Sequence, residues 1–116
     1  MRLPAKVFIA IGTAMALALL WVAGQPGAAE IFPGKWHYVA HFVIFTILGG
    51  VWALGLPRIP LSATVAGIVA FGFIHEAFEI RGHAHGFELY DAIIDGAGAI
   101  AGTLSARFTR AAFTAT

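Results

Sequence analysis

The chain has 116 residues, of which 59% are hydrophobic and 11% are charged, and its mean hydropathy is +0.85. Soluble domains carry about 25% charged residues, so this composition indicates a single-domain integral membrane protein. A net charge of +1 gives no reason to expect nucleic acid as a partner, and the absence of cysteine excludes disulfides, thiolate zinc sites and iron–sulfur clusters.

Four apolar stretches approach the length of about 20 residues that a helix needs to cross a bilayer. The first covers about 7–23 and is followed by Gly24-Gln25-Pro26-Gly27, a sequence that ends helices. The others cover about 36–56, 62–80 and 89–108. The sequence therefore predicts an all-α, polytopic membrane protein: a bundle of four transmembrane helices with short loops, all within one domain.

The basic residues indicate how such a bundle is oriented. A basic start followed by an apolar run also occurs in signal peptides, but we interpret residues 7–23 as a retained first helix. Five of the seven basic residues fall on one side of a four-span path, and Lys35 and Arg81 fall on the other. Because lysine and arginine favour the cytoplasmic side, we expect both termini to lie in the cytoplasm.

All five histidines and all six acidic residues fall in two short windows, 30–41 and 75–95. The start of the second span, the end of the third and the start of the fourth reach the same membrane face, so the two windows should meet there. Ionisable residues in or beside spans are costly and indicate function by default. The predicted ligand-binding cluster comprises His37, His41, His75, Glu76, Glu79, His85, Glu88, Asp91 and Asp95.

A metal site is one interpretation of this cluster. His75 and Glu79 share a helix face, and two more histidines follow shortly after. Imidazole and carboxylate groups bind zinc and other divalent metals, so we predict a divalent metal with ligands drawn from His75, Glu79, His83 and His85. The motif differs from the His-Glu-x-x-His of zinc proteases, because Glu79 occupies its last position.

One face of the fourth predicted span carries a stripe of residues that are acidic at its start and small in its later turns. Its members recur at intervals of three and four residues: Asp91, Asp95, Gly98, Gly102 and Ser105. The spacing Gly98-x-x-x-Gly102 favours close packing against a neighbouring helix. Carboxylates on such a face need partners, which we expect to be histidines, Lys35, Arg81 or a bound cation.

The order of these polar residues resembles the VanZ-like family of small bacterial membrane proteins over about 37–104. The family's Asp-Lys-x-x-His-Phe opening corresponds to residues 37–42, with His41 and Phe42 retained. Its Glu-x-x-Gln corresponds to Glu76-Ala77-Phe78-Glu79. Its last motif corresponds to residues 84–102, where Glu88, Asp91, Gly98 and Gly102 are retained.

The resemblance implies a small helical bundle in the bacterial inner membrane, and an action on a ligand at the cell envelope, since the family is associated with glycopeptide resistance. The chain departs from the family at several charged positions. Asp-Lys becomes His37-Tyr38, Gln becomes Glu79, Arg becomes His85 and Asn becomes Asp95.

Three functions therefore stay open. The first is a VanZ-like protein that binds an envelope or lipid-linked ligand at the outer face, and the second is a metal-binding membrane protein. The third is an accessory subunit packed against a larger respiratory or photosynthetic membrane complex. In such a complex His41 could ligate haem or chlorophyll, although an interfacial histidine without a ligand is the favoured interpretation. A proton relay ranks last, because the polar residues gather at one face and form no path across the bilayer.

Overall fold

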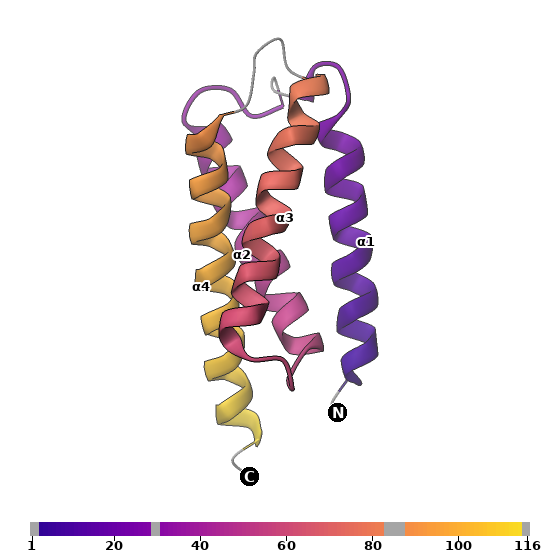
Figure 1. Cartoon of the computed structure of the whole chain (residues 1–116), viewed down its shortest axis with the longest axis vertical. Coiled ribbons are helices and arrows are strands. Elements are labelled where there is room, and N and C mark those ends of the chain that lie inside the picture. Colours follow the sequence, from indigo (N-terminus) through magenta and orange to yellow (C-terminus); the bar gives the residue numbers. More distant parts are fainter. Residues whose placement is uncertain (1–2, 29–30, 83–87, 115–116) are drawn as a thin grey trace.

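The computed structural model describes residues 3–28, 31–82 and 88–114, and this part of the chain folds into four helices without strands (Figure 1). The helices are α1 (Ala5–Ala23), α2 (Trp36–Gly55), α3 (Leu61–Gly82) and α4 (Leu89–Thr114). The predicted all-α bundle is confirmed. Each predicted span corresponds to one helix; α2 ends one residue before the predicted end at 56, and α4 continues past the predicted end at 108.

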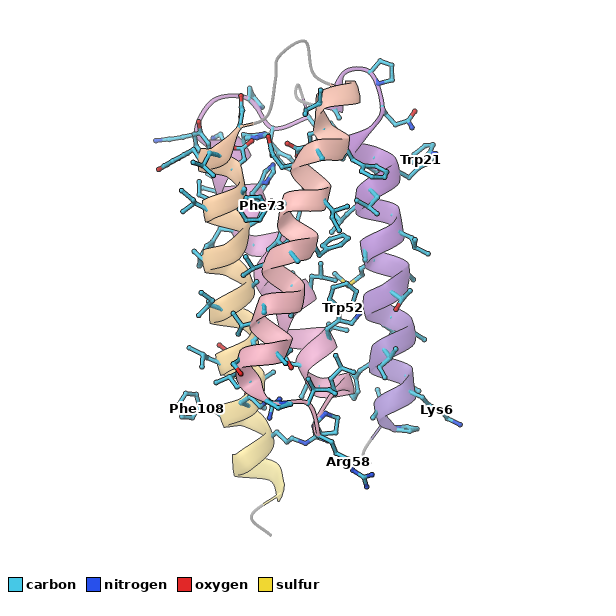
Figure 2. The ribbon with its side chains drawn as sticks, viewed as in Figure 1. Lys6, Trp21, Trp52, Arg58, Phe73 and Phe108 are labelled. Atoms are coloured by element: carbon cyan, nitrogen blue, oxygen red, sulfur yellow. The ribbon has the colours of Figure 1, made fainter. Side chains whose placement is uncertain are left out.

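Three of the described helical segments are long and apolar enough to cross a membrane: Ala5–Ala23, Trp36–Gly55 and Leu61–Ile80. Their outer faces carry large exposed side chains such as Trp21 and Ile47, and Trp21 projects away from the bundle in Figure 2. A soluble protein rarely exposes so much contiguous apolar surface, whereas a bilayer covers it. The helix α4 is not among these segments, so its crossing of the membrane stays a prediction.

The tightest packing in the bundle joins α2 to α4, which are parallel because both start at the same end. A Cβ atom added to Gly98 would lie 2.6 Å from the carbonyl oxygen of Phe42, and one on Gly102 would lie 1.9 Å from that of Thr46. The partner helix α2 contributes a glycine to the same contact: a Cβ on Gly49 would lie 2.7 Å from the Ala99 carbonyl oxygen of α4. Glycine therefore lets the two backbones touch, as the predicted small stripe requires.

An apolar core fills the middle of the bundle beside this contact. Phe45 and Leu48 of α2 are fully buried, and the Phe45 ring lies 5.9 Å from the Phe71 ring of α3, measured between centroids. The helix α1 closes the side: a Cβ on Gly12 would lie 2.3 Å from the indole of Trp52, so α1 also approaches through a glycine.

The end of α4 is held against the turn between α2 and α3. The guanidinium of Arg107 donates a hydrogen bond to the carbonyl oxygen of Ile59, and Arg110 Nη1 donates one to the Leu54 carbonyl oxygen at 3.4 Å. These side chains satisfy carbonyl groups at and after the end of α2, which the helix itself leaves without partners.

We expect opposite effects from alanine at two helical glycines. Gly102→Ala should lower the free energy of unfolding by about 1–3 kcal/mol, because the new methyl group overlaps the Thr46 carbonyl and forces α2 and α4 apart. The matched control Gly67→Ala lies on an exposed face of α3 with open space around it, so it should raise the free energy by about 0.5–1 kcal/mol. Thermal unfolding in detergent measures both, and equal effects would contradict the close α2–α4 contact.

Candidate functional site

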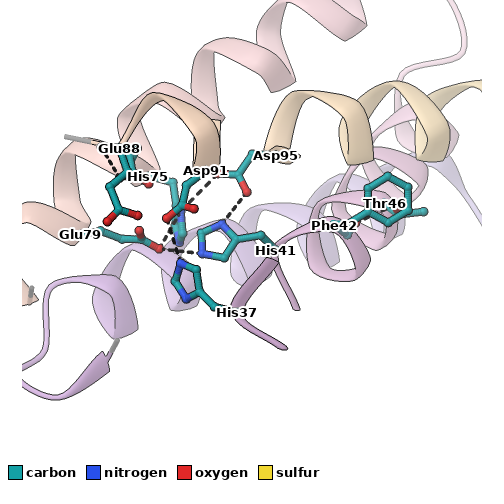
Figure 3. Close-up of polar contacts among 10 residues, drawn as sticks. His37, His41, Phe42, Thr46, His75, Glu79, Glu88, Asp91 and Asp95 are labelled. Atoms are coloured by element: carbon teal, nitrogen blue, oxygen red, sulfur yellow. Dashed lines mark hydrogen bonds and ion pairs between the residues drawn. The ribbon is translucent and has the colours of Figure 1, made fainter. Parts of the chain in front are cut away.

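Two histidines of α2 face two aspartates of α4 in the same register (Figure 3). His37 Nε2 lies 2.8 Å from Asp91 Oδ2, and His41 Nδ1 lies 2.6 Å from Asp95 Oδ1. Both pairs are separated by 54 residues in the sequence, as expected when two i, i+4 pairs lie on parallel helices. The glycine contact one and two turns further along brings these side chains within hydrogen-bond distance.

The helix α3 adds a carboxylate and an imidazole to the other side of His41. Glu79 Oε1 lies 3.1 Å from His41 Nε2 and 3.6 Å from His75 Nδ1. His75 Nδ1 also lies 3.7 Å from Asp95 Oδ2. The His75 ring rests edge-on against Phe45, with centroids 5.4 Å apart, so the polar cluster lies directly on the apolar core.

A second carboxylate of α3 holds the start of α4 in place. Glu76 is 1% exposed, and its Oε1 accepts a hydrogen bond of 2.9 Å from the backbone N–H of Glu88. This N–H precedes α4 and would otherwise lack an intrahelical partner. Glu76, Glu88 and Asp91 each bring one oxygen atom within 4.8 Å of the others.

The buried part of the cluster carries an excess of negative groups. Its carboxylates are Glu76, Glu79, Asp91 and Asp95, all 5% exposed or less. They face three imidazoles, so one negative charge stays uncompensated when all four carboxylates are ionised and every imidazole is protonated. Buried carboxylates are strongly disfavoured without compensation, so the cluster requires additional protons or a bound cation.

Several atoms of the cluster have no hydrogen-bond partner in the described part of the chain. They include His75 Nδ1, Glu79 Oε2 and Asp95 Oδ2, all on residues at most 6% exposed. Orphaned atoms of this kind are rare in native proteins and point to a water molecule or an ion. Three overlapping groups of residues here have ligand atoms close enough together to hold a metal ion.

The structure thus places seven of the nine predicted ligand-binding residues together in one buried cluster, which we call the His/carboxylate cluster: His37, His41, His75, Glu76, Glu79, Asp91 and Asp95. Glu88 lies at its edge. The predicted residues His83 and His85 lie outside the described residues. Gly98 and Gly102 lie at the α2–α4 contact, one and two turns beyond the cluster.

Sequence reasoning missed an apolar pocket that reaches the cluster from the side of α1. It is formed by the end of α1, the segment between α1 and α2, and the facing sides of α2 and α3. Ile31 and Phe32 belong to its lining, although they lie between the predicted spans. No pattern in the sequence indicates that these segments meet.

Comparisons with protein-family models, with curated proteins and with solved structures found no match for this chain. The resemblance to the VanZ-like family therefore stays a prediction.

A double-mutant cycle tests the pairing of His41 with Asp95. Replacing each residue and then both by alanine should reveal a coupling energy of about 0.5–3 kcal/mol, because the side chains share one buried hydrogen bond. As control, Ser105→Ala lies about 15 Å further along α4 than Asp95, so its effect should add to that of His41→Ala within about 0.5 kcal/mol. Additive behaviour of His41 and Asp95 would contradict the contact.

Proposed function

We propose that this chain is an integral membrane protein that binds a divalent transition-metal ion, such as zinc, at the His/carboxylate cluster. The proposed ligands are His41 Nε2, His75 Nδ1 and Glu79 Oε1. The observation that carries the proposal is the orphaned His75 Nδ1, which lies among carboxylate oxygens at distances too long for hydrogen bonds.

The two distances from Glu79 Oε1 to the imidazole nitrogens are compatible with a shared metal ion. Zinc binds imidazole nitrogen and carboxylate oxygen at about 2.0–2.2 Å, which places tetrahedral ligand atoms about 3.3 Å apart. Glu79 Oε1 lies 3.1 Å and 3.6 Å from the two imidazole nitrogens. In contrast, the distances of 2.6 and 2.8 Å on the α4 side are those of hydrogen bonds.

Asp95 supports the proposal by orienting one of the ligands. When His41 Nδ1–H donates to Asp95 Oδ1, its Nε2 is left as the acceptor atom that can bind a metal. Metal-binding histidines commonly donate their second N–H to a carboxylate in this way. Without a metal, His41 satisfies both carboxylate contacts as a donor only in its doubly protonated form.

Charge gives a further reason for a cation. The four buried carboxylates outnumber the three imidazoles, so a divalent ion lowers the repulsion that burial imposes on them. Histidine together with carboxylate oxygen suits zinc and neighbouring transition metals, whereas magnesium and calcium prefer oxygen alone. Three protein ligands also leave one coordination position open, as in catalytic zinc sites.

Zinc titration of the chelator-treated protein tests the proposal. We expect one zinc ion per chain in the calorimetric titration. His75→Ala and Glu79→Gln should each weaken binding at least tenfold, and Asp95→Asn should weaken it about 10–100-fold by releasing His41. The control Gln25→Ala changes a half-buried side chain beyond the end of α1, outside the cluster, and should leave the affinity unchanged. Absence of stoichiometric zinc, or unchanged affinity in His75→Ala, would show that the cluster only holds the bundle together.

We further propose that the protein lies in a bacterial inner membrane, with four spans and both termini in the cytoplasm. The basic side chains of Lys6 and Arg58 lie at the same end of the bundle (Figure 2), and basic residues favour the cytoplasmic side. The absence of cysteine makes a direct test simple. A membrane-impermeant maleimide should label Gln25→Cys but not Arg58→Cys in intact cells, and the reverse pattern would overturn the orientation.

A further inference from the structure

The apolar pocket beside the His/carboxylate cluster has two chemically different parts. Its volume is about 80 Å³, several times the roughly 10–15 Å³ that one buried water molecule needs. Nine of its thirteen lining residues are apolar, and they come from α1, from the segment before α2, and from α2 itself. The other four are His37, His41, His75 and Glu79. The pocket is therefore mostly apolar, with polar side chains at one part of its lining.

The polar end of the pocket coincides with the proposed metal ligands. His41, His75 and Glu79 all line the pocket, whereas Asp91 and Asp95 of α4 do not. A metal ion held by these three side chains would therefore be reached from the apolar part of the pocket, and not from the side of α4. Glu79, whose side chain is 6% exposed, lines the same end of the pocket.

We propose that this pocket binds one end of an amphiphile: its anionic oxygen head group would occupy the open position of the metal, its first methylene groups would contact the apolar walls, and the rest of its hydrocarbon chain would extend out of the pocket, whose volume is about 80 Å³. The proposal rests on the metal site proposed above and names the class of ligand which that site takes. The head group is a carboxylate or a phosphate, as in a fatty acid or a lipid-linked phosphate.

Charge explains why the metal must be present. Without it, an anionic head group would meet the excess of buried carboxylates and be repelled. A bound divalent ion offers the head group a coordination bond and a compensating charge. A small hydrated anion does not bind well against apolar walls, because it would lose its water of hydration. Burial of a hydrocarbon chain against the same walls is favourable. Only a molecule with both parts satisfies both ends of the pocket.

The experiment uses the full chain in phosphatidylcholine nanodiscs, with laurate, dodecyl phosphate and dodecanol as radiolabelled probes. We expect zinc-loaded protein to bind one laurate or one dodecyl phosphate per chain, and removal of zinc by chelation to weaken that binding at least tenfold. Dodecanol, which lacks the anionic oxygen, should bind at least tenfold more weakly than the better anionic probe. The better of the two anionic probes distinguishes a fatty acid from a phosphate ligand.

Filling the pocket separates this inference from the metal site. Val22→Trp enlarges a lining residue of α1 and should weaken binding of the anionic probe at least tenfold while zinc affinity stays within twofold. The matched control Val43→Trp makes the same change on an exposed face of α2 outside the pocket and should alter neither. Leu19→Trp, at another position of the pocket wall, serves as the second variant if Val22→Trp loses zinc as well.

The outcomes differ for the two proposals. If the protein binds zinc but shows no metal-dependent binding of an anionic probe, the amphiphile proposal is wrong and the metal site stands. The same holds if Val22→Trp and Leu19→Trp leave probe binding unchanged. Failure to bind zinc overturns the metal site and the amphiphile together.

Discussion

The contact between the backbones of α2 and α4 is the constraint on which the rest of the structure depends. Glycines at 49, 98 and 102 let the two helices approach until main-chain atoms touch, and few other arrangements would tolerate such a distance. Because the helices are parallel, this contact fixes their register. The register sets His37 opposite Asp91 and His41 opposite Asp95, so small residues in one part of the stripe position the charged residues in another.

The helix α3 turns this row of pairs into a site. It places Glu79 on the free side of His41 and His75 beside both, while Phe45 and Phe71 support the His75 ring from the core. The helix α1 has a different role. It covers the core through Gly12 and Trp52, but near the cluster it leaves a pocket. The bundle is therefore closed over its apolar core and accessible at its polar end.

The helices and the meeting of the two polar windows could be predicted, because hydropathy and topology leave few alternatives for a chain this short. Spacing also identified the shared faces of His75 with Glu79 and of Asp91 with Asp95. The individual pairings could not be predicted, because they depend on a register set by backbone contacts with Thr46 and Gly49 in a different helix. The hydrogen bond from the Glu88 N–H to Glu76 could not be predicted from the sequence either, because it depends on the residue at which α4 begins. Predictions that concern a family, a larger complex, or the histidines at 83 and 85 stay predictions.

The central claim is that two imidazoles and one carboxylate of the cluster share a metal ion. X-ray absorption spectroscopy of the zinc-loaded protein in nanodiscs tests it most directly. We predict nitrogen and oxygen ligands at about 2.0–2.2 Å, with the multiple-scattering signal of two imidazoles that falls to one in His75→Ala. A zinc shell made only of oxygen, or an imidazole signal unchanged in His75→Ala, would contradict the account.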